Sequence, residues 1–304
     1  MLRSFAKEMK KNYVFYLMAL PGVLFIFMFS YVPMPGLVLA FKNYNFQDGI
    51  FGSPWAGFSN FAFFFGSDKA FSITFNTLYL NFLFIVFGLI FQIGSAILIN
   101  EAGNKDFKRT VQSIQFLPYF FSWVVVSGLV YSLFSGELGS VNKILEFVGL
   151  QPVSWYNNAD YWRPILVGTN LWKFTGYGAI IYLSTITGIS TEYYEAAKID
   201  GAGKLQQIRH ITLPLLVPTA IIMTLLNIGR IFYGDFGMMY SIVKDNGLLL
   251  RTMEVIDTYV YRAMRSLGDV SFASAIGLYQ SVAGFIIVYT TNQLSKKYQG
   301  TSLF

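Results

Sequence analysis

The chain has 304 residues, of which 54% are hydrophobic, 18% aromatic and only 12% charged. Ordinary soluble domains carry roughly 25% charged residues, so this chain lacks the polar surface that keeps a soluble protein dispersed. The absence of cysteine excludes a disulfide scaffold and thiolate chemistry, and the high hydrophobic fraction excludes intrinsic disorder. The composition therefore indicates a membrane protein.

Six stretches of the chain are free of Asp, Glu, Lys and Arg, with Lys173 as the single interruption. They cover residues 12–41, 70–100, 110–136, 164–191, 210–229 and 270–295. About 20 apolar residues cross the hydrocarbon core as a helix, so each stretch can cross once. None shows the alternation of a barrel strand. We therefore predict an all-α membrane protein with six transmembrane helices.

The first stretch follows a basic segment that contains Arg3, Lys7, Lys10 and Lys11. A secretory signal begins in the same way, but this apolar stretch is too long for one and no small-x-small cleavage site closes it. We expect an uncleaved first helix. No connection between the spans exceeds about 40 residues, which is too short for an independent core. We therefore expect one membrane domain over 1–304, with the N-terminal segment and first span in 1–41 and five core spans in 70–295.

The positive charges set the predicted orientation. Lys and Arg gather at the N-terminus, in the 101–110 and 192–209 loops and at Lys296–Lys297. Short loops rich in Lys and Arg stay in the cytoplasm, so both termini are predicted to be cytoplasmic in a multi-pass protein of the cell membrane. The net charge of +6 is then a topology signal, and no nucleic-acid partner is expected. Segments 138–149 and 252–265 are predicted to be short amphipathic helices on the outer face.

Enzyme machinery is largely missing from the sequence. Gly203–Lys204 lacks the glycine spacing of a phosphate-binding loop. His210 is the single histidine and lies at a membrane edge, where an interfacial role is expected. No Asp or Glu lies within the six stretches. We expect no catalytic residue, no metal site and no cofactor on this chain.

Two basic residues do fall within or beside the predicted spans, Lys173 and Arg230. Intramembrane charges usually face a cavity or the interior of a bundle, but both could also reach the headgroups, and the sequence leaves the two interpretations open. Their polar and aromatic neighbours suit a sugar, which stacks on rings and takes hydrogen bonds. The candidate substrate-pathway residues are Asn170, Trp172, Lys173, Tyr177, Asn227, Arg230, Tyr233 and Asp235.

The loop over 190–213 is predicted to form a helix, a hinge and a second helix. Ser190 or Thr191 can cap the first helix, and Glu192 and Glu195 lie near its positive end. Gly201 and Gly203 permit a sharp change of direction. A simple connector needs only a few residues, so this loop is expected to dock a partner and transmit motion.

At this loop the chain resembles the permease subunits of ABC importers with the type I architecture. Their hallmark is Glu-Ala-Ala, three residues, Gly, nine residues and Ile-x-Leu-Pro, which is matched here by 195–197, Gly201 and 211–214. Weaker matches include Leu20–Pro21–Gly22 and Phe116–Leu117–Pro118–Tyr119. The fuller form of the motif, with Ile199–Asp200–Gly201–Ala202 and residues 211–216, resembles the carbohydrate-uptake branch of that family. The loop departs from the family at Gln207, where a less polar residue is often found.

The resemblance implies the type I permease fold, with 190–213 as a cytoplasmic coupling loop. ATP and Mg²⁺ would bind two separate ATPase subunits, and a second, different permease and an extracytoplasmic solute-binding protein would complete the importer. Oligosaccharide and membrane lipid are the other expected partners. The ATPase-coupling residues implied by the motif are Tyr194, Glu195, Ala196, Ala197, Asp200, Gly201 and Ala202.

The tail of the chain is similar to permeases that import alginate or pectin fragments. The similarity rests on 229–238, 255–262 and the ending Ser302–Leu303–Phe304. It implies acidic or complex oligosaccharides as substrate, with Lys173 and Arg230 as counter-charges. A permease for a neutral sugar or another small solute is the alternative. A secondary transporter would show inverted repeats and intramembrane acids, and neither is visible in this sequence. A membrane-embedded enzyme would need a catalytic constellation of residues, which is missing. A structural or assembly protein would not need the loop motif.

Overall fold

The computed structural model describes residues 11–136 and 139–299, with the side chains of 298 and 299 excepted. The basic residues Arg3, Lys7 and Lys10, the apolar Leu138 and the Ser302–Leu303–Phe304 ending lie outside the described residues. The described part is helical, with one isolated bridge between Lys42 and Trp55. Helices satisfy their own backbone groups, as lipid requires of continuously apolar segments.

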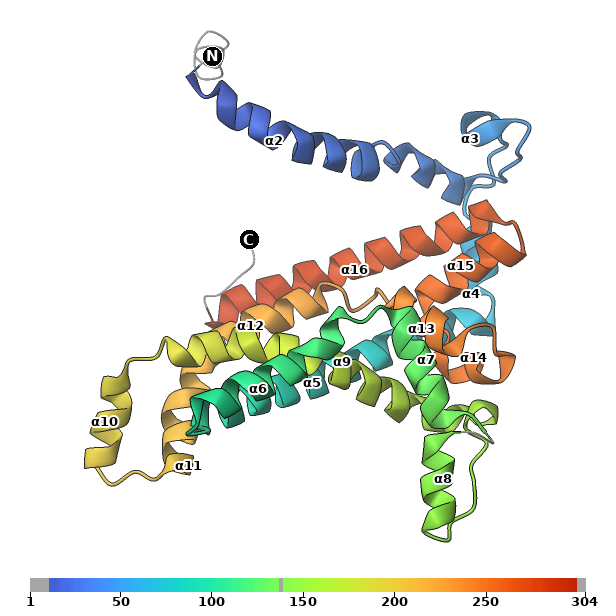
Figure 1. The fold of residues 1–304 in the computed structure, drawn as a ribbon. Coiled ribbons are helices and arrows are strands. Elements are labelled where there is room, and N and C mark those ends of the chain that lie inside the picture. Colours follow the sequence, from blue (N-terminus) through green and yellow to red (C-terminus); the bar gives the residue numbers. More distant parts are fainter. Residues whose placement is uncertain (1–10, 137–138, 300–304) are drawn as a thin grey trace.

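The first predicted span forms one bent helical segment, Tyr13–Phe41. It runs through α2 (Tyr13–Ile26), a π-helical turn η1 (Phe27–Tyr31) and a 3₁₀ segment η2 (Met34–Phe41). No residue of α2 is buried, and the helix stands apart from the remaining bundle (Figure 1). Only η2, at the end of the segment, packs on the bundle, against α16 (Val270–Gln299).

The bundle is organised around α5 (Asp68–Glu101) and α9 (Trp162–Thr187), which pack along their length. Small residues permit this approach, because a Cβ on Gly178 would lie 2.1 Å from Cδ of Gln92. Helices α6 and α12 pack against this pair, and α16 packs against α12. Their bounds are Lys105–Phe116, Leu213–Ile228 and Val270–Gln299.

Four helical segments in the described part of the chain are long and apolar enough to cross a membrane, and a bent pair makes up to five. The four are Tyr13–Phe41, Asp68–Glu101, Lys204–Ile228 and Val270–Lys297, which match the first, second, fifth and sixth predicted spans. The place of the fourth is taken by α9, which has 26 residues but is not among the four. The all-helical membrane architecture predicted from the sequence is confirmed.

The third predicted span is not one uninterrupted helix, which corrects the sequence interpretation. Residues 105–120 and 123–134 form two helical parts that meet at 102°. Pro118 is the second residue of the 3₁₀ turn η3 (Leu117–Phe120). The Ser122 hydroxyl caps the new helix α7 (Trp123–Phe134) by accepting from the amide of Val125. The proline and the new cap divide an apolar stretch that is otherwise long enough for one helix.

Short helices gather at one end of the molecule, called here the far end, opposite α10 and α11 (Figure 1). The predicted amphipathic segments correspond to two of them, α8 (Ser140–Phe147) and α15 (Ile256–Ser266). The others are α3 (Gly49–Gly52), α4 (Ser59–Phe65), η4 (Trp155–Asn157), η5 (Ala159–Tyr161), α13 (Phe236–Val243) and α14 (Gly247–Met253). A buried cluster around Trp162, Met238 and Leu249 holds α7, α9, α13 and α14 together.

Candidate functional site

Residues 190–213 form a helical elbow that projects from the bundle (Figure 1). Its first arm, α10 (Thr191–Ile199), is capped by the Ser190 hydroxyl, which accepts from the Glu192 amide at 3.3 Å. At its other end the amide of Ala202 donates to the Ala197 carbonyl at 2.8 Å. Gly201 has φ +80°, the left-handed conformation that ends such a helix most readily. The predicted first helix is therefore present, and the sharp turn after it lies at Gly201, whereas Gly203 has an ordinary φ of −70°.

The second arm returns to the bundle through α11 (Lys204–Gln207) and the π-helical turn η6 (Ile208–Thr212), which leads into α12. The buried Gln207 amide donates to the Ala202 carbonyl at 2.9 Å, which gives a physical reason for a polar residue at this position. Tyr194 and Thr212 join the two arms through their hydroxyls at 3.0 Å. These contacts make the elbow one ordered unit.

The elbow forms an ion pair with the bundle and also exposes apolar side chains to its surroundings. Lys204 pairs with Glu101 at the end of α5, with 2.5 Å between Nζ and Oε2. Ile199 and Leu205 are 87% and 79% exposed. Apolar side chains at the tip of a projecting element are expected at a protein–protein contact. The elbow can therefore receive a partner at its tip and pass its motion to α5 and α12.

A hollow of about 300 Å³ lies between the two arms. It is lined by Ala197, Asp200, Gly201, Ala202, Gln206, Gln207, His210 and Ile211. The His210 Nδ1 lies 3.0 Å from the Gln206 carbonyl one turn before it, on the exposed side of the elbow. This position fits the interfacial role expected for the histidine.

Lys173 lies at the break in the third span. Its side chain is buried, and its ammonium donates to the carbonyls of Pro118 at 3.3 Å, Tyr119 at 3.0 Å and Phe121. The nitrogen also lies 5.1 Å from the ring centre of Trp123. A cation at carbonyls that a broken helix leaves unpaired is favourable. Lys173 therefore holds the bend between η3 and α7.

Two other candidate pathway residues flank the same break. Tyr177 stacks on Tyr119 with ring centres 4.5 Å apart, and Trp172 stacks on Phe121 at 6.3 Å. The side chains of Trp172 and Tyr177 remain partly exposed, at 46% and 43%. The structure thus brings Trp172, Lys173 and Tyr177 together around one bend, whereas it gives no side-chain partner for Asn170 among the described residues.

The remaining candidates follow the end of α12. Arg230 is exposed in the turn that follows the helix, and the Tyr233 hydroxyl donates to Ser281 at 3.4 Å. Asp235 joins this group to the break, because its carboxylate accepts from the Trp123 indole at 2.8 Å. It also caps α13 at the Met238 amide. Asn227 instead lines a small cavity between α5, α9 and α12.

The residues that hold the turn between α12 and α13 were not among the candidates predicted from the sequence. Asn81 on α5 donates to the carbonyls of Ile231 and Tyr233 at 3.0 and 3.1 Å. Asp257 accepts from the Gly234 amide at 2.6 Å and from the Gln280 amide at 3.1 Å. Asn81 and Gln280 are amides in otherwise apolar stretches, and that was the available signal.

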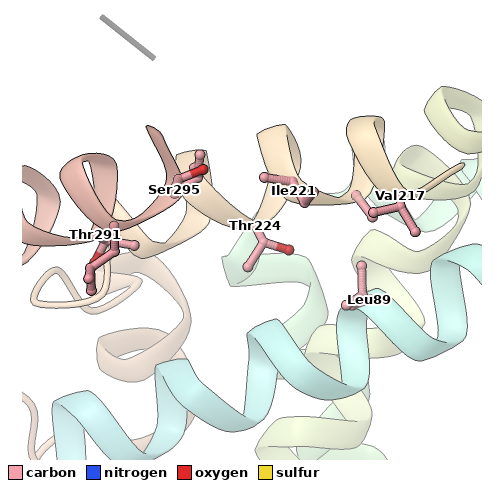
Figure 2. A pocket seen from close by; sticks show the side chains of 9 residues that line it. Leu89, Val217, Ile221, Thr224, Thr291 and Ser295 are labelled. Carbon is pink, nitrogen blue, oxygen red and sulfur yellow. The ribbon is translucent and has the colours of Figure 1, made fainter. Parts of the chain in front are cut away.

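A further cavity of about 410 Å³ lies between α5, α12 and α16 (Figure 2). Figure 2 shows Leu89 on α5, Thr224 on α12 and Thr291 on α16 around it. None of the candidate pathway residues lines this cavity. Within the described residues no group of His, Asp and Glu is placed to hold a metal ion.

The bundle of membrane-length helices and the projecting helix–turn–helix elbow, together with the family match, identify an importer permease, the non-catalytic membrane subunit. Residues 1–299 match the family described as binding-protein-dependent transport system inner membrane component, and the chain belongs to this family. It is thus a multi-pass inner-membrane protein of an ABC transporter complex that works with a binding protein. The resemblance at the elbow motif is confirmed.

The matches to individual proteins extend over nearly the whole chain. The polygalacturonan/rhamnogalacturonan transport system permease protein YteP of Bacillus subtilis is 36% identical, over 97% of this chain and 91% of the relative. Protein LplB of the same organism is 34% identical, over 99% and 94%. A bacterial ABC transporter involved in the import of the acidic polysaccharide alginate has a chain of the same fold, with a TM-score of 0.89 and 34% identity over 97% of this chain and 99% of that one.

Proposed function

We propose that this permease imports acidic oligosaccharides, such as fragments of uronic-acid polysaccharides, by ATP-driven alternating access. The similarity to the alginate and polygalacturonan/rhamnogalacturonan permeases along the full chain carries the proposal. Arg230, exposed in the turn after α12, supports it as a counter-charge for a carboxylate. We assign Lys173 a different part, because its ammonium is engaged by three carbonyls: it shapes the pathway at the bend.

In the assembly we propose, this chain is one permease domain over 1–304, with its core in 70–295, and pairs with a second, different permease. The bare sides of α2 support a partner chain there. Each elbow docks in an ATPase subunit through Tyr194–Ala197 and Asp200–Ala202, and closure of the ATPases rocks the spans. The elbow, the start of α6 and the end of α16 share one end of the molecule (Figure 1). Their Lys and Arg residues favour a cytoplasmic position for that end and for both termini.

The substrate is tested by uptake into proteoliposomes that contain the complete importer, its ATPases and its binding protein. Arg230→Gln should lower the uptake of a uronate trisaccharide several-fold and leave that of its methyl ester nearly unchanged, because only the free acid carries a charge for Arg230. Arg230→Lys should retain most of the activity. Equal uptake of both sugars by the wild type would favour a permease for neutral sugars, and an unaffected Arg230→Gln variant would remove Arg230 from the pathway.

A further inference from the structure

Another cavity lies at the far end of the molecule, and no residue of the elbow and no candidate pathway residue lines it. It has a volume of about 180 Å³ and lies between α7, the η4 turn and the end of α13. Its lining residues are Ser127, Tyr131, Tyr156, Ser241, Ile242, Val243, Lys244 and Asn246. They come from three parts of the chain, so the cavity exists only in the folded protein.

Two aromatic rings form one wall of this cavity. Tyr131 and Tyr156 have ring centres 5.7 Å apart and are tilted by 56°. Tyr156 is held from behind by the fully buried Trp162, 4.5 Å away between ring centres. Its backbone carbonyl also accepts from the side-chain amide of Asn246 at 2.9 Å. A rigid aromatic wall of this kind can contact the apolar face of a sugar ring.

Lys244 supplies the positive charge of the cavity. It ends α13 with φ +52°, and it is the single non-glycine residue with positive φ in the described part of the chain. Such strained backbone is retained where the surrounding structure requires it, and it is often found at functional sites. The neighbouring Asp245 carboxylate lies 3.6 Å from Arg262, so it is engaged elsewhere. Lys244 itself has no ion pair among the described residues.

Hydroxyl groups complete the lining. The hydroxyls of Tyr131, Tyr156 and Ser241 make no hydrogen bond within the described residues, so each is free to donate to a ligand or accept from it. Burial raises the pKa of Tyr156 to about 12, with a smaller contribution from Tyr131. Its phenol therefore stays protonated at physiological pH and remains a hydrogen-bond donor.

We propose that this cavity binds one acidic sugar residue of the incoming oligosaccharide, with the ring on Tyr131 and Tyr156 and the carboxylate at Lys244. The volume is below the roughly 300–1,000 Å³ of pockets that enclose a larger ligand, and so it suits one residue at the end of a chain. The proposal rests on the proposed function, which it extends by a first binding position at the end of the molecule opposite the elbow.

The test measures the half-maximal concentration for uptake of a uronate trisaccharide by the complete reconstituted importer. Lys244→Gln should raise it roughly fivefold, the contribution of an exposed ion pair, and should leave it unchanged for the methyl ester of the same sugar. Tyr131→Leu should raise it for both sugars, because ring contact does not depend on charge. Lys143→Gln, an exposed lysine on α8 outside the cavity, is the matched control and should change neither.

Two outcomes would overturn the proposal while the proposed function stands. One is a wild type that imports the uronate sugar and a Lys244→Gln variant that matches it. The other is a Lys244→Gln or Tyr131→Leu variant that loses the second permease on co-purification, since the cavity would then be a subunit contact. Failure of the wild type to import any uronate sugar would instead refute the proposed function itself.

Discussion

Gly201 is the position at which the coupling role of the elbow can be tested most specifically. Its φ of +80° is one that residues with a Cβ adopt at a cost of roughly 1–2 kcal/mol. A Cβ built there meets no atom within 4 Å, so replacement adds backbone strain without a clash. Gly201→Val should therefore insert and assemble normally. This strain should lower the ratio of the native turn to other conformations of the turn by a factor of about 5–30.

The assay is the number of oligosaccharide molecules imported per ATP hydrolysed by the reconstituted importer. We expect Gly201→Val to lower this ratio by about 5–30-fold, because the distorted turn no longer transmits closure of the ATPases. Gly201→Asn should stay close to the wild type, since Asn tolerates the left-handed region. Gly203→Val is the matched control, because Gly203 has an ordinary φ of −70°. A normal ratio in Gly201→Val would refute the hinge role.

Three further predictions concern stability. Lys173→Met leaves the carbonyls at the bend without their cation and should destabilise the complex by about 1.5–3 kcal/mol, seen as a lower Tm; an unchanged Tm would show that the bend does not need the lysine. In Gly176→Ala the new Cβ would lie 2.0 Å from the Gln115 carbonyl oxygen, and this clash should lower the stability by about 1–3 kcal/mol. In the control Gly168→Ala the new Cβ meets no atom within 4 Å, so the Tm should stay unchanged. Burial raises the pKa of Asp257 above its ordinary value of 3.8, so the folded state binds more protons than the unfolded state, and stability should fall as pH rises from 3.8 through the raised pKa. Asp257→Asn should flatten that part of a Tm-against-pH curve, and an equal slope in both proteins would contradict the assignment.

The elbow could be predicted from the sequence because its signals are local. The cap at Ser190 and the turn at Gly201 lie within a dozen residues of each other, and each residue type is chosen by backbone geometry. The long apolar helices were predictable for a similar reason, since an unbroken apolar stretch must be helical in lipid. Local backbone chemistry therefore accounts for what the sequence predicts correctly.

The break in the third span could not be predicted in the same way. Pro118 weakens the helix, but the bend is held by Lys173 from α9, more than 50 residues away in sequence. The cavity around Lys244 likewise depends on rings at 131 and 156 that only the fold brings to it. When the role of a residue depends on partners that are distant in sequence, its sequence neighbours do not predict that role. An isolated lysine in a span is therefore compatible with several roles.

This permease is proposed to move acidic oligosaccharides at the expense of ATP. This proposal is tested most directly by uptake of a panel of oligosaccharides of equal length, uronate and neutral, into proteoliposomes with the complete importer. We expect ATP-dependent uptake of the uronate sugars, with a half-maximal concentration at least several-fold lower than for the neutral ones. Preferential uptake of the neutral sugars, or uptake that does not require ATP, would contradict the proposed function.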